Sequence, residues 1–113
     1  MSVSAVVSYR PGAEDDDAPN LLPVATEEVF RRYWLPLADR LDQPTVAAFG
    51  TGVTFLPADF DALLDELTGF IDGVRAHTDQ GAAGLSSVLE RACLLSDFIR
   101  SLDRERVQEL FIG

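Results

Sequence analysis

The sequence predicts an α+β fold in which a small antiparallel sheet of about three to four strands packs against three helices. Two observations support this prediction. Three long segments carry apolar residues at every third or fourth position, which indicates helices, and shorter segments rich in Val, Phe and Ile lie beside turn residues, which indicates strands. With 113 residues the chain has the length of one domain, so residues 1–113 are interpreted as a single globular domain.

The strongest prediction is a helix over residues 57–76. Pro57 suits a first helical position, where its missing N–H costs nothing, and Asp59 lies in the first turn, where the helix dipole favours a carboxylate. Gly69 and Gly73 lie within the helix, either to let another backbone approach closely or simply to weaken its end. The apolar stripe consists of Phe60, Leu63, Leu64, Leu67, Phe70, Ile71 and Val74.

Two further helices are predicted on either side of it. In the helix over residues 26–41, Thr26 can act as the N-cap, and Pro36 predicts a kink or a restart because it removes one backbone hydrogen bond. The helix over residues 87–102 opens with a capping box at Ser87. Its apolar residues cover so much of the circumference that we expect it to be central or to supply a subunit contact.

The strands are predicted from shorter signals. Residues 3–9 form a first strand, and residues 46–55 are interpreted as a hairpin around Gly50, with one bulged strand as the alternative. Residues 107–112 are interpreted as a last strand, although a helical extension competes with that assignment. The acidic, proline-bounded residues 12–20 are predicted to form a mobile loop.

The charge balance limits the kinds of partner. The chain has 19 acidic and 9 basic residues, a formal net charge of −10. Nucleic acid and anionic membrane surfaces are therefore unexpected partners, because both require cations on the protein, whereas a basic protein would be attracted. No apolar run is long enough to span a membrane, and the single Cys gives no internal disulfide. We expect a cytoplasmic protein, and the absence of Lys points to a GC-rich bacterial source.

Residues suited to catalysis or metal binding are few. The single Cys, Cys93, lies on a broadly apolar helix, and the single His, His77, lies where the long helix ends. Nothing in the sequence brings them together as a nucleophile and base or as a zinc site. The consecutive residues Asp15, Asp16 and Asp17 lack the alternating spacing of a calcium loop. The sequence therefore predicts no catalytic residues, no metal and no cofactor.

The polar face of the 57–76 helix gives the best functional candidate. It carries carboxylates at helical spacing that form an acidic ridge, namely Asp61, Asp65 and Asp72, with Asp59 and Glu66 beside them. Such a face complements a basic protein surface, which favours fast and specific association. The sequence therefore predicts a non-enzymatic, acidic protein-binding domain, of the kind that an immunity protein or antitoxin uses to cover a cationic toxin.

Two alternatives remain open from the sequence. The first is a self-associating structural or regulatory domain, in which the helix over residues 85–102 forms a homodimer contact. The second is a small ligand-binding or enzymatic fold that uses carboxylates together with Tyr33 or Trp34 in a pocket. The second alternative predicts a concave site on which several polar groups converge.

Overall fold

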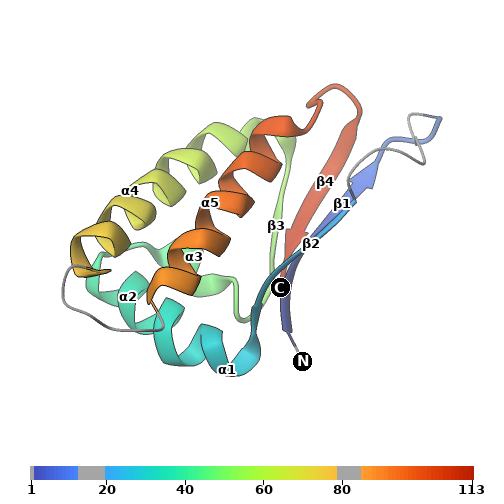
Figure 1. The fold of residues 1–113 in the computed structure, drawn as a ribbon. Helices are drawn as coiled ribbons and strands as arrows, with labels where there is room; N and C mark the ends of the chain where they lie inside the picture. The colour runs from blue at the N-terminus through green and yellow to red at the C-terminus, as the bar shows by residue number, and fades with distance from the viewer. Residues whose placement is uncertain (1, 13–19, 79–84) are drawn as a thin grey trace.

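The computed structural model describes residues 2–12, 20–78 and 85–113 and has two layers. Four antiparallel strands form a sheet in the order β2-β1-β4-β3, and the helices cover one of its faces (Figure 1). The strands are β1 Ser2–Tyr9, β2 Leu21–Thr26, β3 Val53–Phe55 and β4 Val107–Ile112. The helices are α1 Glu27–Val29, α2 Leu35–Arg40, α3 Pro44–Ala48, α4 Phe60–Thr78 and α5 Leu85–Ser101. The predicted α+β class is confirmed.

The two central strands, β1 and β4, are those at the ends of the described chain. Val3, Ala5 and Val7 are buried beneath the helices, while the residues between them face the other side of the sheet. In β4, Leu110 and Ile112 are fully buried. The predictions of strands at residues 3–9 and 107–112 are therefore confirmed, and the competing helical extension of the chain end is excluded.

The prediction of a hairpin over residues 46–55 was wrong. Its first half is α3, in which Pro44 occupies an early position that suits proline. Val46 and Phe49, three residues apart, are both fully buried, so helical spacing prevails over strand propensity. The second half is β3, which pairs with β4. The turn predicted around Gly50 is present, but it joins a helix to a strand.

Strand β2 was not predicted. Its proline, Pro23, removes one backbone donor and is tolerated because β2 is an edge strand of the sheet. Residues 13–19, which make up most of the predicted acidic loop, lie outside the described residues, as do the three consecutive aspartates considered for calcium.

The first predicted helix is divided by a π-helical segment, Phe30–Trp34. It begins as expected at Thr26, whose Oγ1 accepts a hydrogen bond of 3.2 Å from the Val29 N–H. The Leu35 N–H then bonds to the Phe30 carbonyl, five residues back, immediately before Pro36. Pro36 has no N–H and cannot donate a helical hydrogen bond. The kink or restart that the sequence predicted at Pro36 is therefore present as a wide π-helical turn just before it.

Helix α5 is central, which was one of the two roles predicted for it from the sequence. Six of its residues are buried, and it packs against both α4 and β2 (Figure 1). The position of its capping box was wrong, because the helix already includes Leu85 and Ser87 therefore lies in its first turn.

Gly69 and Gly73 allow the segment after α2 to approach α4 closely. A Cβ atom at Gly69 would lie 2.8 Å from the Gln43 side-chain nitrogen, and one at Gly73 would overlap the Leu41 methyl groups. The sequence left open the close approach of another backbone at these glycines, but the atoms that approach them belong to side chains.

Helix α2 ends in a Schellman motif that depends on one residue of positive φ. The Gln43 N–H bonds to the Ala38 carbonyl at 2.8 Å, and the Asp42 N–H bonds to the Asp39 carbonyl at 3.3 Å. Asp42 has φ 56°, a left-handed conformation that glycine adopts without strain and a β-branched residue adopts with difficulty.

We predict that Asp42→Val lowers the free energy of unfolding by about 1 kcal/mol or more, whereas Asp42→Gly leaves it unchanged or raises it. Urea denaturation of the two variants beside the wild type measures the difference. Equal midpoints for the Val and Gly variants would show that the backbone conformation at this position contributes nothing to stability.

Candidate functional site

The structure places the predicted acidic ridge on the outer side of α4. Asp61, Asp65 and Asp72 are all exposed and follow one another at helical spacing. The opposite side of the helix buries Leu67 and Phe70 completely in the core. The three carboxylates therefore form a line along the surface, as the sequence predicted for their positions.

The two flanking carboxylates have bonds within the fold. Asp59 Oδ2 accepts a hydrogen bond of 2.9 Å from the Leu56 N–H and so caps the start of the helix. Glu66 Oε1 accepts a hydrogen bond of 2.8 Å from the Thr45 N–H, which links α4 to the start of α3. Their binding to a partner stays a prediction, but both already have a structural role.

Two of the ridge carboxylates have arginine neighbours. Arg104 lies 2.6 Å from Asp61 Oδ1 and also lies over the Phe60 ring, 5.8 Å from its centroid. Arg75 lies 3.8 Å from Asp72 in a pair that is exposed on both sides. Among the described residues, Asp65 has no ion pair. Exposed pairs of this kind contribute little to stability, so the ridge keeps most of its capacity to attract cations.

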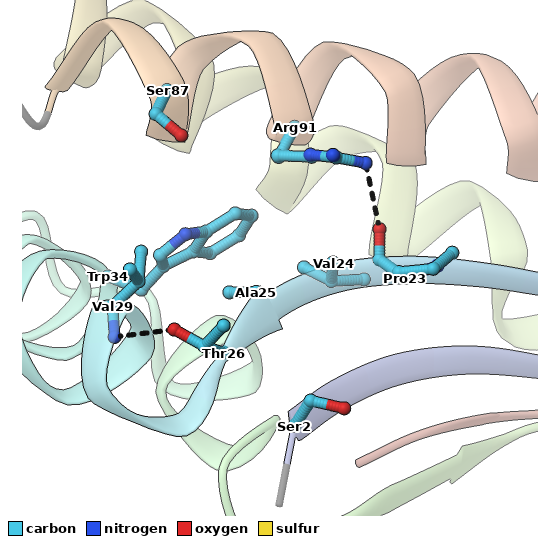
Figure 2. Close-up of a pocket in the computed structure, with 9 residues that line it drawn as sticks. All are labelled: Ser2, Pro23, Val24, Ala25, Thr26, Val29, Trp34, Ser87 and Arg91. Atoms are coloured by element: carbon cyan, nitrogen blue, oxygen red, sulfur yellow. Dashed lines mark hydrogen bonds between the residues drawn. The ribbon is translucent and has the colours of Figure 1, made fainter.

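A second candidate site is a pocket between β2, the π segment and the first turns of α5 (Figure 2). Its volume is about 400 Å³. Trp34, one of the two aromatic residues that the sequence suggested for a pocket, lines it, and Tyr33 does not. The lining residues are Ser2, Pro23, Val24, Ala25, Thr26, Val29, Trp34, Ser87 and Arg91.

Two polar side chains of this pocket, those of Trp34 and Arg91, can only donate hydrogen bonds. The Trp34 side chain is fully buried, and its Nε1–H has no hydrogen-bond partner within the described part of the chain. Figure 2 shows the indole nitrogen on the edge of the ring that faces Ser87. The Arg91 guanidinium donates a long hydrogen bond of 3.4 Å to the Pro23 carbonyl. None of the described lining residues is acidic, so this pocket differs from the carboxylate site that the sequence suggested.

The uncovered face of the sheet carries a row of apolar side chains. The strand register places Leu21 opposite Val6 and Val6 opposite Phe111, so the row crosses β2, β1 and β4. These three residues are 57%, 39% and 42% exposed, respectively. Cross-strand neighbours of this kind lie close enough to act as one surface. This row was not predicted from the sequence, because β2 was not recognised as a strand.

The remaining candidates are not assembled into a site in the described residues. Cys93 is half-buried on α5, and His77 belongs to the last turn of α4. Across residues 2–12, 20–78 and 85–113, no three His, Cys, Asp or Glu side chains gather closely enough to hold a metal ion. None of the helices described there is long and apolar enough to cross a membrane.

Comparisons of the chain with protein-family models, with curated proteins and with solved structures give no match. The protein is therefore characterised by its own architecture. It is an α+β protein with a four-stranded antiparallel sheet, an acidic helix on its outer surface and a small pocket that contains the Trp34 indole and the Arg91 guanidinium.

Arg104 lowers the pKa of the Asp61 carboxyl, chiefly through its hydrogen bond and secondly through its charge. Since this pKa is lower in the folded chain than in the unfolded one, the pair stabilises the fold above the unfolded pKa. That contribution is lost as the pH falls through the folded pKa.

We predict that Arg104→Gln raises the pKa of Asp61 toward its ordinary value, which carboxyl chemical shifts followed against pH would measure. The difference in stability between the wild type and the variant should be larger at neutral pH than in strong acid, where Asp61 is protonated. An unchanged Asp61 titration in the variant would contradict the role given to Arg104.

Proposed function

We propose that this chain is a non-enzymatic binding protein whose acidic ridge on α4 docks a basic protein partner. The observation that carries the proposal is the line of exposed carboxylates Asp61, Asp65 and Asp72 on one side of a 19-residue helix. A rigid helix holds these charges at fixed spacing, so a partner with cations at matching positions needs little rearrangement to bind.

The charge of the whole chain supports the same proposal. A formal net charge of −10 produces an attractive field for a cationic partner and speeds its approach. At contact, Asp65 is the ridge carboxylate to which the described structure assigns no cation, and the exposed pairs of Asp61 and Asp72 can exchange their arginines for cations of the partner. An immunity or antitoxin role, in which the ridge covers a cationic toxin, is the specific form of this proposal.

We predict that changing Asp61, Asp65 and Asp72 together to Lys weakens binding of the basic partner by at least about tenfold, because like charges then face each other. The measurement is capture of the partner from a lysate of the source cells with tagged protein, washed at low and at high salt, followed by titration of the purified pair.

The matched control changes Glu28, Asp39 and Glu90 to Lys, which alters the net charge equally at exposed positions on other helices. This control should keep most of the affinity. An equal loss of affinity in both variants would show that net charge alone attracts the partner. Unchanged affinity in the ridge variant would show that the ridge on α4 is not part of the interface.

Self-association is a second candidate function, favoured by the apolar row of Leu21, Val6 and Phe111 on the uncovered sheet face. The sequence had suggested α5 as the contact, but most apolar residues of that helix already pack within the chain. Leu94 is the large apolar residue of α5 that stays exposed in the described structure. The sheet face therefore offers the larger apolar surface for a second copy.

We predict that, if the protein forms dimers, the double variant Val6→Thr and Phe111→Thr makes it monomeric, since it removes the apolar row and keeps strand propensity. Light scattering across a concentration series measures the oligomeric state. Leu94→Gln is the comparison on α5. If the double sheet variant still forms dimers and Leu94→Gln does not, the dimer contact lies on α5 and not on the sheet.

A further inference from the structure

We propose that the pocket between β2, the π segment and α5 is a binding site for a small organic carboxylate. In this site the Trp34 Nε1–H donates a hydrogen bond to the ligand, and Arg91 balances the ligand's charge. The site is separate from the acidic ridge on α4, and its ligand has the opposite charge from the basic partner proposed for the ridge.

The unpaired indole N–H of Trp34 is the main observation. Nearly all buried polar groups in folded proteins have a hydrogen-bond partner, so a buried donor without one requires an explanation. The Trp34 side chain is 0% exposed, and its Nε1 has no partner in the described structure. Because Trp34 also lines the pocket, an acceptor oxygen of a ligand seated there can supply the missing partner once neighbouring side chains move enough to open access to the buried N–H.

The position of the indole ring is fixed by its neighbours. It stacks on Phe70 of α4 at a centroid distance of 5.2 Å and on Phe30 at 6.1 Å. Trp34 is also the last residue of the π segment, and such segments occur often at functional sites. The N–H direction is therefore set before a ligand arrives, as binding sites require.

The charge of the pocket is opposite to that of the rest of the protein. Arg91 is the charged group among its described lining residues, in a chain that has 19 acidic and 9 basic side chains. The nearby Glu27 is paired with Arg31 at 2.6 Å. The pocket thus offers an uncompensated cation, which favours an anionic ligand.

Arg91 and Ser87 can both turn toward such a ligand. The described structure holds the Arg91 guanidinium by a single hydrogen bond of 3.4 Å, beyond the usual length for such bonds. Ser87 projects its hydroxyl toward the side of the pocket where the Trp34 nitrogen lies (Figure 2). Ser87 also lies in the first turn of α5, where the helix dipole adds positive potential.

The shape and composition of the pocket select the kind of anion. One cation and two neutral donors match the single charge and two oxygens of a carboxylate better than the higher charge of a phosphate. Val24, Ala25 and Val29 form apolar walls that suit a short hydrocarbon chain or a ring. A volume of about 400 Å³ is within the range of small-molecule sites.

Ligand binding can be tested by following the NMR signal of the Trp34 indole N–H itself. Trp34 is the single Trp of the chain, so a ¹⁵N-labelled sample gives one indole cross-peak in a two-dimensional NMR spectrum. Titration with hexanoate and with benzoate at neutral pH should shift this peak in a saturable way. Hexanol, which has the same chain without the charge, and inorganic phosphate serve as comparison ligands and should bind at least about tenfold more weakly.

Two surface variants test the role of the cation, and a third tests the role of Ser87. Arg91→Gln should weaken carboxylate binding about tenfold, which is the usual effect of losing one charged hydrogen bond. Arg100→Gln, on the same helix but outside the pocket lining, should leave binding unchanged. Ser87→Ala should weaken binding by a smaller factor. All three positions are exposed, so these variants should fold as the wild type does.

Four results would overturn the proposal. The first is an indole cross-peak that does not move at millimolar hexanoate or benzoate. The second is a shift that hexanol reproduces, and the third is a shift that Arg91→Gln leaves unaltered. The fourth is preferential saturation by phosphate, which would show that the pocket binds a different class of anion.

Discussion

The stack of Phe30, Trp34 and Phe70 is the interaction on which the arrangement of the helices depends. It joins the irregular first helix to α4, while α5 packs on both α4 and the sheet. All three rings are buried, and large rings contribute most of the apolar area of a core this small. The same stack fixes the indole ring beside the pocket, so packing and the candidate ligand site share one element.

Long periodic segments were predictable from the sequence, and short or irregular ones were not. The apolar stripe of α4 and the β-branched residues of β1 were sufficient to predict both elements, because each repeats one signal over many residues. In contrast, α3 has five residues, among which Val46 favours a strand locally, and β2 contains Pro23. In both cases tertiary packing determined the secondary structure, and a local sequence pattern carries no information about tertiary packing.

The candidate sites were predictable to different extents. The acidic ridge depends only on helical spacing, so the positions of Asp61, Asp65 and Asp72 followed from the sequence. The internal bonds of Asp59 and Glu66 did not, because their partners depend on tertiary contacts. The pocket was suggested only through Trp34. Arg91 lies 57 positions further along the chain, and no sequence pattern links these two residues before the fold brings them to one pocket.

The π segment has a consequence for how this chain tolerates changes in length. A turn closed by a bond to the fifth residue back contains one residue more than an α-helical turn. Loss of one residue there would let a regular α-helical turn form, and because the wide turn already accommodates the additional residue, the segments on either side would keep nearly the same orientation. The segment between Thr26 and Pro36 should therefore tolerate the loss of one exposed residue, such as Arg31 or Arg32, better than a regular helix would.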